Sequence, residues 1–527
     1  MQRLIPPLLI ALLASSAAAR PPTRAETWTA DIATLASDAM AGRQPGTPGY
    51  EAAARYVEKR FRALGLRPAG EAKGFRQIVR FEEQIIDHGA STAALIAADG
   101  SRTALAMGKD ILISPGGAPR PARIEAPLVF LGYGLSLPAL GHDDFKGLDL
   151  KGKIAVVISG GPAALPGPAK SANRSDRLAL LAAAGAVGVI TLTTPAQVEI
   201  PWDRRKLLAS QAGMYFADAG MRETPDGMFV AQFDPAQSAR LFAGSGQDFA
   251  VIAKAADASA PVPTFALPLR LSAGIAARHR AVESPNLVAR LPGSDPKLRS
   301  EHVVISAHLD HIGVGEPING DAIYNGAMDD ASGVASVLDI AGRLVAGKRP
   351  ARSLLFLIVT AEEKGLLGSQ YYARRPTVPA ASLVADLNFD MPLPLWPLKL
   401  VLVQGYQEST LGDVARRVAT ARGLALTPDP LPERNSFTRT DQFSFVKTGV
   451  PALAFKFGFV KDSPEFQIEH DWRANRYHAP SDDADQPGVL PGEAVKLDDY
   501  VTGIARAVAN AKARPEWLDT SVFKPKG

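Results

Sequence analysis

The chain contains a series of histidine and carboxylate residues that follow apolar segments or precede a predicted helix. A chain without cysteine must hold any metal ion through imidazole and carboxylate groups, and this donor set suits zinc. Two zinc ions about 3.5 to 4 Å apart that share a carboxylate can lower the pKa of a bound water towards about 7. The series is His308, Asp310, Asp329, Asp330, Glu362, Glu363 and Asp390, and a second histidine, His478, lies in a loop late in the chain.

The spacing of the acids favours chemistry over a purely structural role. A lone histidine–aspartate pair in a loop is often structural, and Asp329 with Asp330 would also suit the first turn of a helix predicted over 331–346. The adjacent pair Glu362 and Glu363, in contrast, follows an apolar strand. Neighbouring residues at a strand end point in different directions, so one can bind a metal while the other acts as general base on the water.

Apolar runs over 303–306, 354–359, 383–389 and 398–403 alternate with helices predicted over 331–346 and 366–373. This alternation predicts an α/β fold with a mixed, mostly parallel sheet and helices on both of its faces. Ligands bind at the carboxyl ends of strands in such sheets. We therefore expect the polar residues that follow each run to meet at one edge.

The segment before this alternating region has a different pattern. Thr47 and Pro48 predict the start of an amphipathic helix that ends near Gly65. From 81 to 271, short apolar runs are separated by glycine and proline, which predicts a β-rich insert. We expect three parts after the N-terminal segment: 20–80, the insert 81–271, and a catalytic core 272–527.

Composition limits the class of protein. The 527 residues are 46% hydrophobic and 21% charged, which is typical of folded globular proteins. The 58 lysines and arginines nearly balance 54 aspartates and glutamates, and no dense basic run with interleaved aromatic residues is present. Nucleic acid is therefore not an expected partner.

The first 19 residues have the pattern of a secretory signal peptide. A short basic start precedes the apolar run 4–13, and small residues at 17–19 suit cleavage before Arg20. The run is too short to span a membrane, and no cysteine follows for lipid attachment. We expect a periplasmic or secreted protein with no membrane span in the mature chain.

In order and spacing, these motifs resemble the M28 family of dizinc aminopeptidases, and the insert resembles a protease-associated (PA) domain. The PA resemblance rests on Phe130-Leu-Gly-Tyr-Gly134, Asp149-Leu-Lys-Gly-Lys153 and the stretch 182–190. The peptidase resemblance rests on His308-x-Asp310, Gly326-x-Met328-Asp329-Asp330-x-Ser-Gly333, Glu362-Glu363, Asp390 and Tyr477-His478-x-Pro480.

The resemblance implies peptide substrates, two Zn²⁺ per chain and a role for each residue. His308 and Asp390 would hold one zinc ion, Glu363 and His478 the other, with Asp329 bridging and a cis peptide between Asp329 and Asp330. The catalytic set would be Glu362 as general base, Tyr477 as oxyanion stabiliser, and Asp310 as the acceptor that fixes the His308 tautomer. Arg439 and Asp441 would bind substrate. The oligomeric state is not indicated.

Three alternatives stay open within the sequence. A carboxypeptidase needs cations for a C-terminal carboxylate, and Arg434, Arg439 and Arg476 could supply them. A glutaminyl cyclase agrees less well with the sequence, because one metal ion suffices for that reaction and the ligands for two ions are present here. A non-catalytic peptide-binding relative is expected to have lost ligands.

Co²⁺ or Mn²⁺ could also bind to these ligands. Thr440-Asp441-Gln442 stands where many relatives have Ser-Asp-His, so details of the substrate pocket differ.

Overall fold

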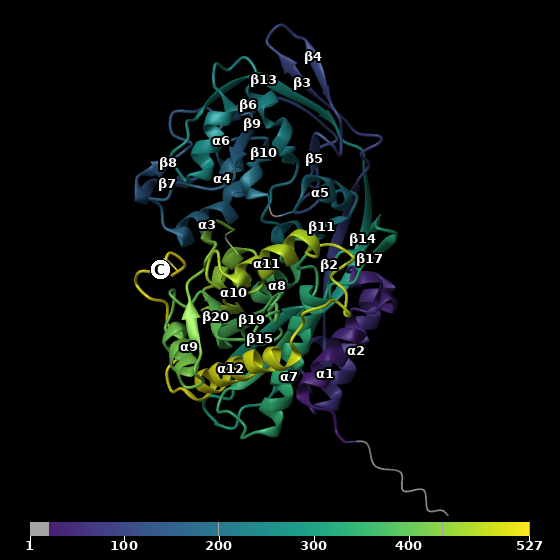
Figure 1. Cartoon of the computed structure of the whole chain (residues 1–527), viewed down its shortest axis with the longest axis vertical. Coiled ribbons are helices and arrows are strands. Elements are labelled where there is room, and N and C mark those ends of the chain that lie inside the picture. Colours follow the sequence, from purple (N-terminus) through teal and green to yellow (C-terminus); the bar gives the residue numbers. More distant parts are fainter. Residues whose placement is uncertain (1–19, 199, 435, 526–527) are drawn as a thin grey trace, which may run out of the picture.

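A computed structural model describes residues 20–198, 200–434 and 436–525. The expected signal peptide, 1–19, lies outside the described residues. Within them, no helix combines the length and the apolar character needed to cross a membrane. The molecule has two parts, with the insert above and a larger sheet with its helices below (Figure 1).

The larger sheet has ten strands within the described residues. The strand order is β11-β2-β14-β18-β15-β19-β22-β20-β21, and β1 pairs with β14. The strands are β1 (Arg67–Pro68), β2 (Arg76–Ile86), β11 (Gly213–Phe216), β14 (Ala277–Leu291), β15 (His302–His308), β18 (Ser353–Val359), β19 (Leu383–Phe389), β20 (Leu400–Gln404), β21 (Ala425–Thr427) and β22 (Ala452–Phe457). A separate hairpin joins β16 (Gly313–Ile318) and β17 (Asp321–Tyr324).

The centre of this sheet is parallel and one flank is antiparallel, while on the other flank β20 pairs antiparallel with β22 and parallel with β21. Parallel pairs join β18, β15, β19 and β22, while β2, β14 and β11 form antiparallel pairs on one flank. The four strands predicted from apolar runs are confirmed as β15, β18, β19 and β20. The prediction of a mixed sheet is also confirmed, with the parallel pairing concentrated in its middle.

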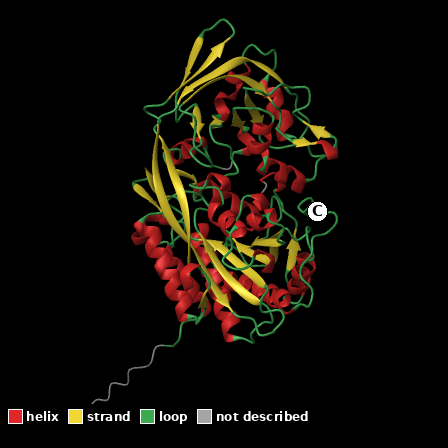
Figure 2. Ribbon diagram, turned by 180° about the vertical axis from the view of Figure 1, so that it is seen from behind, coloured by secondary structure: helices red, strands yellow, loops and turns green. Residues whose placement is uncertain are grey.

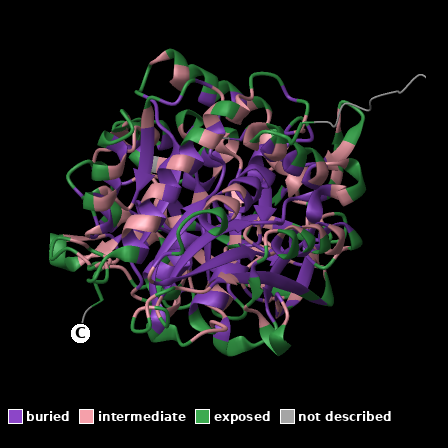
Figure 3. Cartoon of the chain, turned by 90° about the horizontal axis from the view of Figure 1, so that it is seen from below, coloured by how far each residue is buried: buried purple, intermediate pink, exposed green. Residues whose placement is uncertain are grey.

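Both faces of the central strands are buried, which explains their continuous apolar sequences. Val303 and Ile305 of β15 point into one apolar core, and Val304 points into another. Figure 3 shows these strands as a buried layer between helices. Helices packed on the first face are α1 (Arg24–Leu35), α2 (Pro48–Ala63), α7 (Ser332–Ala346), α9 (Leu411–Thr420) and α12 (Pro491–Asn510); α8 (Leu367–Arg374) and α10 (Gln442–Lys447) cover the other face, and α11 (Pro464–Asn475) precedes His478.

The insert has its own sheet of eight strands within the described residues, in the order β4-β3-β13-β6-β9-β10-β12-β5. Its middle strands are parallel and carry helices, so it is β-rich but not all-β. Its elements are β3 (Thr92–Ala97), β4 (Arg102–Leu105), β5 (Ile111–Ile113), β6 (Arg123–Phe130), β9 (Ile154–Ile158), β10 (Gly188–Leu192), β12 (Phe229–Phe233), β13 (Phe265–Gly274), α3 (Gly167–Ser175), α4 (Arg177–Ala183), α5 (Trp202–Leu208) and α6 (Phe249–Asp257), with a small hairpin of β7 (Ser136–Leu137) and β8 (His142–Asp143).

The long antiparallel pair of β2 and β14 connects the two parts, as the paired strands in Figure 2 show. The expected boundaries at residues 81 and 272 therefore fall inside β2 and β13, because each strand continues across the change in sequence pattern. Strand β11, from the middle of the insert sequence, returns to pair with β2 in the larger sheet. The insert sheet itself spans residues 92–274.

Polar contacts dock the insert onto the core. Arg204 of α5 donates to the carbonyl of Ala474 at the end of α11, at 2.7 Å. Lys447 of α10 lies 2.8 Å from Glu223 of the insert, measured between Nζ and Oε2. Helix α3 also packs on the short helix η10 (Ser436–Thr438). The insert thus covers the side of the core that carries α10, α11 and η10.

Arg43 ties the N-terminal segment to the loops beside the parallel strands. Its side chain is fully buried and donates to the carbonyls of Leu35 and Leu309 at 2.7 Å. It also donates to the carbonyls of Asn325 at 2.5 Å and Gly326 at 2.8 Å. One guanidinium therefore satisfies four buried acceptors from three separate segments.

We expect Arg43→Met to lower the free energy of unfolding by about 3 kcal/mol or more, because buried carbonyls would lose their donor. Urea denaturation followed by tryptophan fluorescence measures the change. Arg349→Met, at an exposed position, is the matched control. Equal unfolding midpoints for both variants would contradict this role of Arg43.

Candidate metal centre

Three strand ends bring the predicted ligands together at one edge of the sheet. His308 is the last residue of β15 and pairs in register with Val359, the last residue of β18. Glu362 and Glu363 follow β18, and Asp390 directly follows β19. The expectation that polar residues meet at the carboxyl ends of these strands is confirmed.

Asp329 reaches the same edge from a short π-helical turn, η7 (Ala327–Ala331), that precedes α7. The peptide between Asp329 and Asp330 is cis, as the family resemblance implied. Gly326 has a φ of +63°, and a Cβ there would lie 2.3 Å from the carbonyl oxygen of Asp329. A side chain at position 326 is therefore excluded by this turn.

His308 presents an unsatisfied ring nitrogen to two carboxylates. Its Nδ1 lies 3.0 Å from the backbone carbonyl oxygen of Asp310. Because a carbonyl only accepts, Nδ1 carries the proton and Nε2 of the neutral ring is left with a lone pair. Nε2 makes no hydrogen bond in the structure and lies 3.2 Å from Asp329 Oδ1. Donor atoms of His308, Asp329 and Asp390 lie within 4.8 Å of one another, so a cation fits between them.

A second group of donors lies on the other side of Asp329. His478 Nε2 lies 3.2 Å from Glu363 Oε2 and 3.3 Å from Asp329 Oδ2. His311 Nδ1 lies 2.8 Å from Glu363 Oε1, and donor atoms of His311, Asp329 and Glu363 again lie within 4.8 Å. Two imidazoles therefore face the same pair of carboxylates, and Asp329 belongs to both groups of donors. The residues fit two divalent metal ions.

The electrostatics of the centre favour bound positive charge. Burial lowers the pKa of His308, but nearby acids, with Glu362 foremost, raise it well above its ordinary value. Burial likewise opposes the charged form of His478, yet Glu363 and Asp329 raise its pKa to about 9. Burial would raise the pKa of Asp329, but its contacts with these two histidines hold it well below the usual range. Protons and metal ions therefore compete for the same nitrogens.

Glu362 lies in the cavity but belongs to neither group of donors. Burial, together with the negative charges of Asp390 and Glu363, raises the pKa of Glu362 well above its ordinary value. A bound cation would oppose that effect, because it offsets the repulsion among the acids. Its position is therefore consistent with the expected general base.

Asp310 positions its neighbours through two different groups. Its backbone carbonyl faces His308 Nδ1, while its carboxylate lies 3.9 Å from that nitrogen. The carboxylate instead accepts from the backbone N–H of Glu362 at 3.0 Å and of Glu363 at 3.2 Å. The expected acceptor for His308 is thus the backbone of Asp310, and its side chain fixes the loop that carries both glutamates.

Two residues outside the predicted ligand and catalytic sets also matter to the geometry: His311, expected only to line the site or to support a ligand, and Asp482, which was given no role. His311, three residues after His308, is fully buried against Glu363. Asp482 is fully buried and accepts from the backbone N–H of Met328 at 2.9 Å and of Asp329 at 3.1 Å. Both stand within motifs already recognised, the His-x-Asp-His string and the segment that follows Tyr477-His478, so local sequence contained a signal for each.

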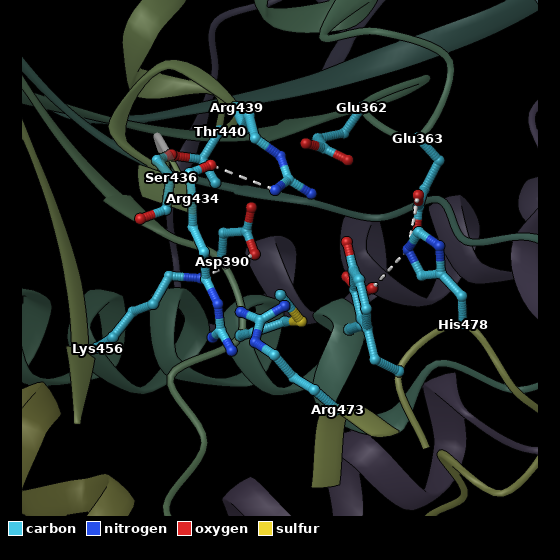
Figure 4. Close-up of a pocket in the computed structure, with 13 residues that line it drawn as sticks. Glu362, Glu363, Asp390, Arg434, Ser436, Arg439, Thr440, Lys456, Arg473 and His478 are labelled. Atoms are coloured by element: carbon cyan, nitrogen blue, oxygen red, sulfur yellow. Dashed lines mark hydrogen bonds and ion pairs between the residues drawn. The ribbon is translucent and has the colours of Figure 1, made fainter. Parts of the chain in front are cut away.

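A cavity lies over the centre, and Figure 4 shows its lining. Tyr477 and Arg439 line it, whereas Asp441 is fully buried at the start of α10 and its neighbour Thr440 lines the cavity instead. The role of Asp441 in substrate binding stays a prediction. Arg476 donates to the carbonyl of Ser481 at 2.5 Å and is not among the lining residues. The lining residues are Asp329, Glu362, Glu363, Asp390, Met391, Arg434, Ser436, Arg439, Thr440, Lys456, Arg473, Tyr477 and His478.

Comparison with known proteins points to one family. Residues 286–494 match Peptidase family M28. A probable zinc metalloprotease of Pyricularia oryzae is 38% identical over 111 residues, which is 21% of each protein. Leupeptin-inactivating enzyme 1 of Streptomyces exfoliatus is 38% identical over 108 residues, or 20% of this chain and 22% of that enzyme. The aligned part thus spans about a fifth of the length of these relatives.

Solved structures extend the likeness of fold to nearly the whole chain. An aminopeptidase from Aneurinibacillus sp. strain AM-1 has a TM-score of 0.54 at 19% identity, covering 95% of this chain and 96% of its own. A Peptidase M28 precursor from Shewanella amazonensis SB2B has a TM-score of 0.50 at 17% identity, covering 94% and 98%. The overall fold of the chain therefore matches known folds.

Adding Zn²⁺ to chelator-treated protein should raise the melting temperature by about 5 °C or more, because a ligand that binds only the folded state stabilises it. Scanning fluorimetry measures the shift. Asp329→Asn should remove most of it, since Asp329 belongs to both groups of donors. The exposed Asp413→Asn is the control and should keep the full shift. A shift that survives Asp329→Asn would place the metal elsewhere.

Proposed function

Because residues 286–494 are a Peptidase family M28 domain, we propose that the protein is an exported metallo-aminopeptidase that removes N-terminal residues from peptides. The observation that carries the proposal is the pair of donor groups that share Asp329 beside Glu362. Export rests on the signal-peptide pattern of residues 1–19, which predicts a periplasmic or secreted enzyme.

The proposed centre holds two Zn²⁺ per chain. His308 and Asp390 would hold one ion, Glu363 and His478 the other, and Asp329 would bridge them. The group of His308, Asp329 and Asp390 supports the first set of ligands. The position of His478 Nε2, 3.2 Å from Glu363 Oε2 and 3.3 Å from Asp329 Oδ2, supports the second. His311 Nδ1 lies 2.8 Å from Glu363 Oε1. His311 would either orient that carboxylate or act as a third histidine ligand of the centre.

When bound, the two ions would lower the pKa of a water and polarise the carbonyl of the scissile peptide bond. Glu362 would take the proton of that water and pass it to the leaving amine. Tyr477 lines the cavity next to His478. Its hydroxyl would donate a hydrogen bond to the carbonyl oxygen as negative charge develops there. Asp310 would keep Glu362 and Glu363 in place through their backbone N–H groups.

Glu362→Gln should lower kcat about a thousandfold, because the amide cannot accept a proton, while zinc content stays near two per chain. Peptide hydrolysis and elemental analysis on the same preparation measure both quantities. Glu516→Gln, at an exposed position near the C-terminus, is the control and should keep full activity. Near-normal turnover by Glu362→Gln would remove Glu362 from the role of base.

The direction of cleavage is tested with one short peptide in free-amine and N-acetylated forms, with and without a zinc chelator. The proposal expects cleavage of the free-amine form alone, because an aminopeptidase must recognise the free N-terminus, and loss of that cleavage after chelation. A carboxypeptidase is the second candidate, favoured by the arginines in the cavity wall. It would cut the acetylated form from its C-terminus. Cleavage of neither form by metal-loaded protein would favour a non-catalytic peptide-binding protein.

A further inference from the structure

One wall of the cavity above the metal centre is cationic. Every carboxylate that lines the cavity belongs to the proposed ligands or is the proposed base, so each already has a role toward the metal ions or the water. The basic lining residues have no such role. In Figure 4 the side chains of the three arginines converge near Asp390, with the lysine beside them. We call this group the basic cluster: Arg434, Arg439, Arg473 and Lys456.

Two members of the basic cluster, Arg434 and Arg473, are held in place before any substrate arrives. Arg434 Nη1 lies 2.8 Å from Glu469 Oε1, and Arg473 Nε lies 2.5 Å from the same oxygen. Their side chains are only 17% and 11% exposed. Arg473 also lies over the ring of Tyr477, with 4.9 Å between Cζ and the ring centroid. A fixed guanidinium loses little conformational entropy on binding, which favours recognition of a group with matching geometry.

The basic cluster lies directly beside the proposed reaction centre. Lys456 Nζ is 3.4 Å from Oδ1 of Asp390, a proposed metal ligand. Arg473 contacts Tyr477, which precedes the proposed ligand His478. An extended peptide advances about 3.3 to 3.6 Å per residue, so a group bound here belongs to a residue next to the scissile bond or one further along.

The insert places the cluster in an enclosed setting. Helix α3 of the insert packs on η10, which follows Arg434 and precedes Arg439 in the chain. Arg204 of the insert donates to the backbone carbonyl of Arg473 at 3.0 Å. The segments that carry the arginines are therefore bounded by the insert. Partial enclosure lowers the effective dielectric constant and so strengthens the attraction of these cations for an anion.

We propose that the basic cluster binds a carboxylate of the peptide substrate within one or two residues of the scissile bond, an inference that rests on the proposed function. Arginine forks match a carboxylate with two parallel hydrogen bonds, and Lys456 adds a point charge. The carboxylate has two sources: the C-terminus of a dipeptide or tripeptide, or an acidic side chain of a longer peptide. In either case the preferred substrates carry negative charge close to the cleaved bond.

The test uses binding, so that it does not depend on turnover. Isothermal titration on metal-loaded Glu362→Gln protein compares two matched pairs of peptides. In the first pair, L-alanyl-L-alanine is compared with its C-terminal amide. In the second, the amide of L-alanyl-L-glutamate is compared with the amide of L-alanyl-L-glutamine. We expect the carboxylate member of at least one pair to bind about tenfold more tightly or better, and the pair that responds identifies the source.

Substitutions in the same background assign the preference to the basic cluster. Arg439→Gln should reduce the affinity ratio to near one, and Arg439→Lys should restore part of it. Arg416→Gln on the exposed face of α9 is the control and should keep the ratio. Melting temperature and zinc content of each variant show that the fold and the centre are intact.

Equal affinities within both pairs, or no binding of any of the four peptides, would overturn the inference. So would a preference for carboxylate that survives Arg434→Gln, Arg439→Gln and Arg473→Gln together. Cleavage of the same peptides by the unsubstituted enzyme is scored separately. Absence of cleavage would count against the proposed function, while preferential binding of carboxylates would still support the role of the cluster.

Discussion

Repulsion among carboxylates gathered in one cavity is the constraint on which the rest of the structure depends. Asp329, Glu362, Glu363 and Asp390 line the same space, and burial makes their negative charges costly. His308 and His478 lie against these acids, and their pKa values are raised as a result. Bound positive charge, which two metal ions would supply, would stabilise such a cluster.

The fold holds these acids through the backbone more than through side-chain pairs. Three parallel strands, β15, β18 and β19, place His308, the two glutamates and Asp390 at one edge of the sheet. Each of these residues stands at or just after the end of a buried apolar strand. Asp310 then fixes the glutamate loop, and Asp482 fixes the turn that carries Asp329. Arg43 connects the same loops to the N-terminal helices. Buried side chains from several distant segments thus hold the backbone around the centre in place.

The strands and most of the proposed ligands could be predicted because their signals are local. All the proposed ligands except His478 follow an apolar run or start a helix, so the pattern of apolar runs places His308, Glu363 and Asp390 at the same edge. The sequence pointed to Asp310 as the acceptor for His308, but only the structure shows that the backbone carbonyl of Asp310, rather than its carboxylate, faces Nδ1. Boundaries of the insert were displaced because β2 and β13 continue across them.

The basic cluster was only partly predictable: Arg434 and Arg439 were candidates from the sequence, whereas Arg473 and Lys456 were not. Lys456 comes from β22, Arg473 from α11 and Arg439 from the loop before α10, and only packing brings them to one wall. Arg476, equally attractive in the sequence, instead contacts Ser481 and does not line the cavity. The residues proposed to bind the substrate carboxylate are therefore brought together by tertiary contacts between distant segments, while most of the proposed metal ligands lie at strand ends.

The most direct test of the central claim is a crystal structure of zinc-loaded protein with anomalous diffraction collected on both sides of the zinc absorption edge. The account predicts two peaks about 3.5 to 4 Å apart, one on each side of the Asp329 carboxylate, with Glu362 bound to neither. A single peak, or two peaks that do not share Asp329, would contradict it.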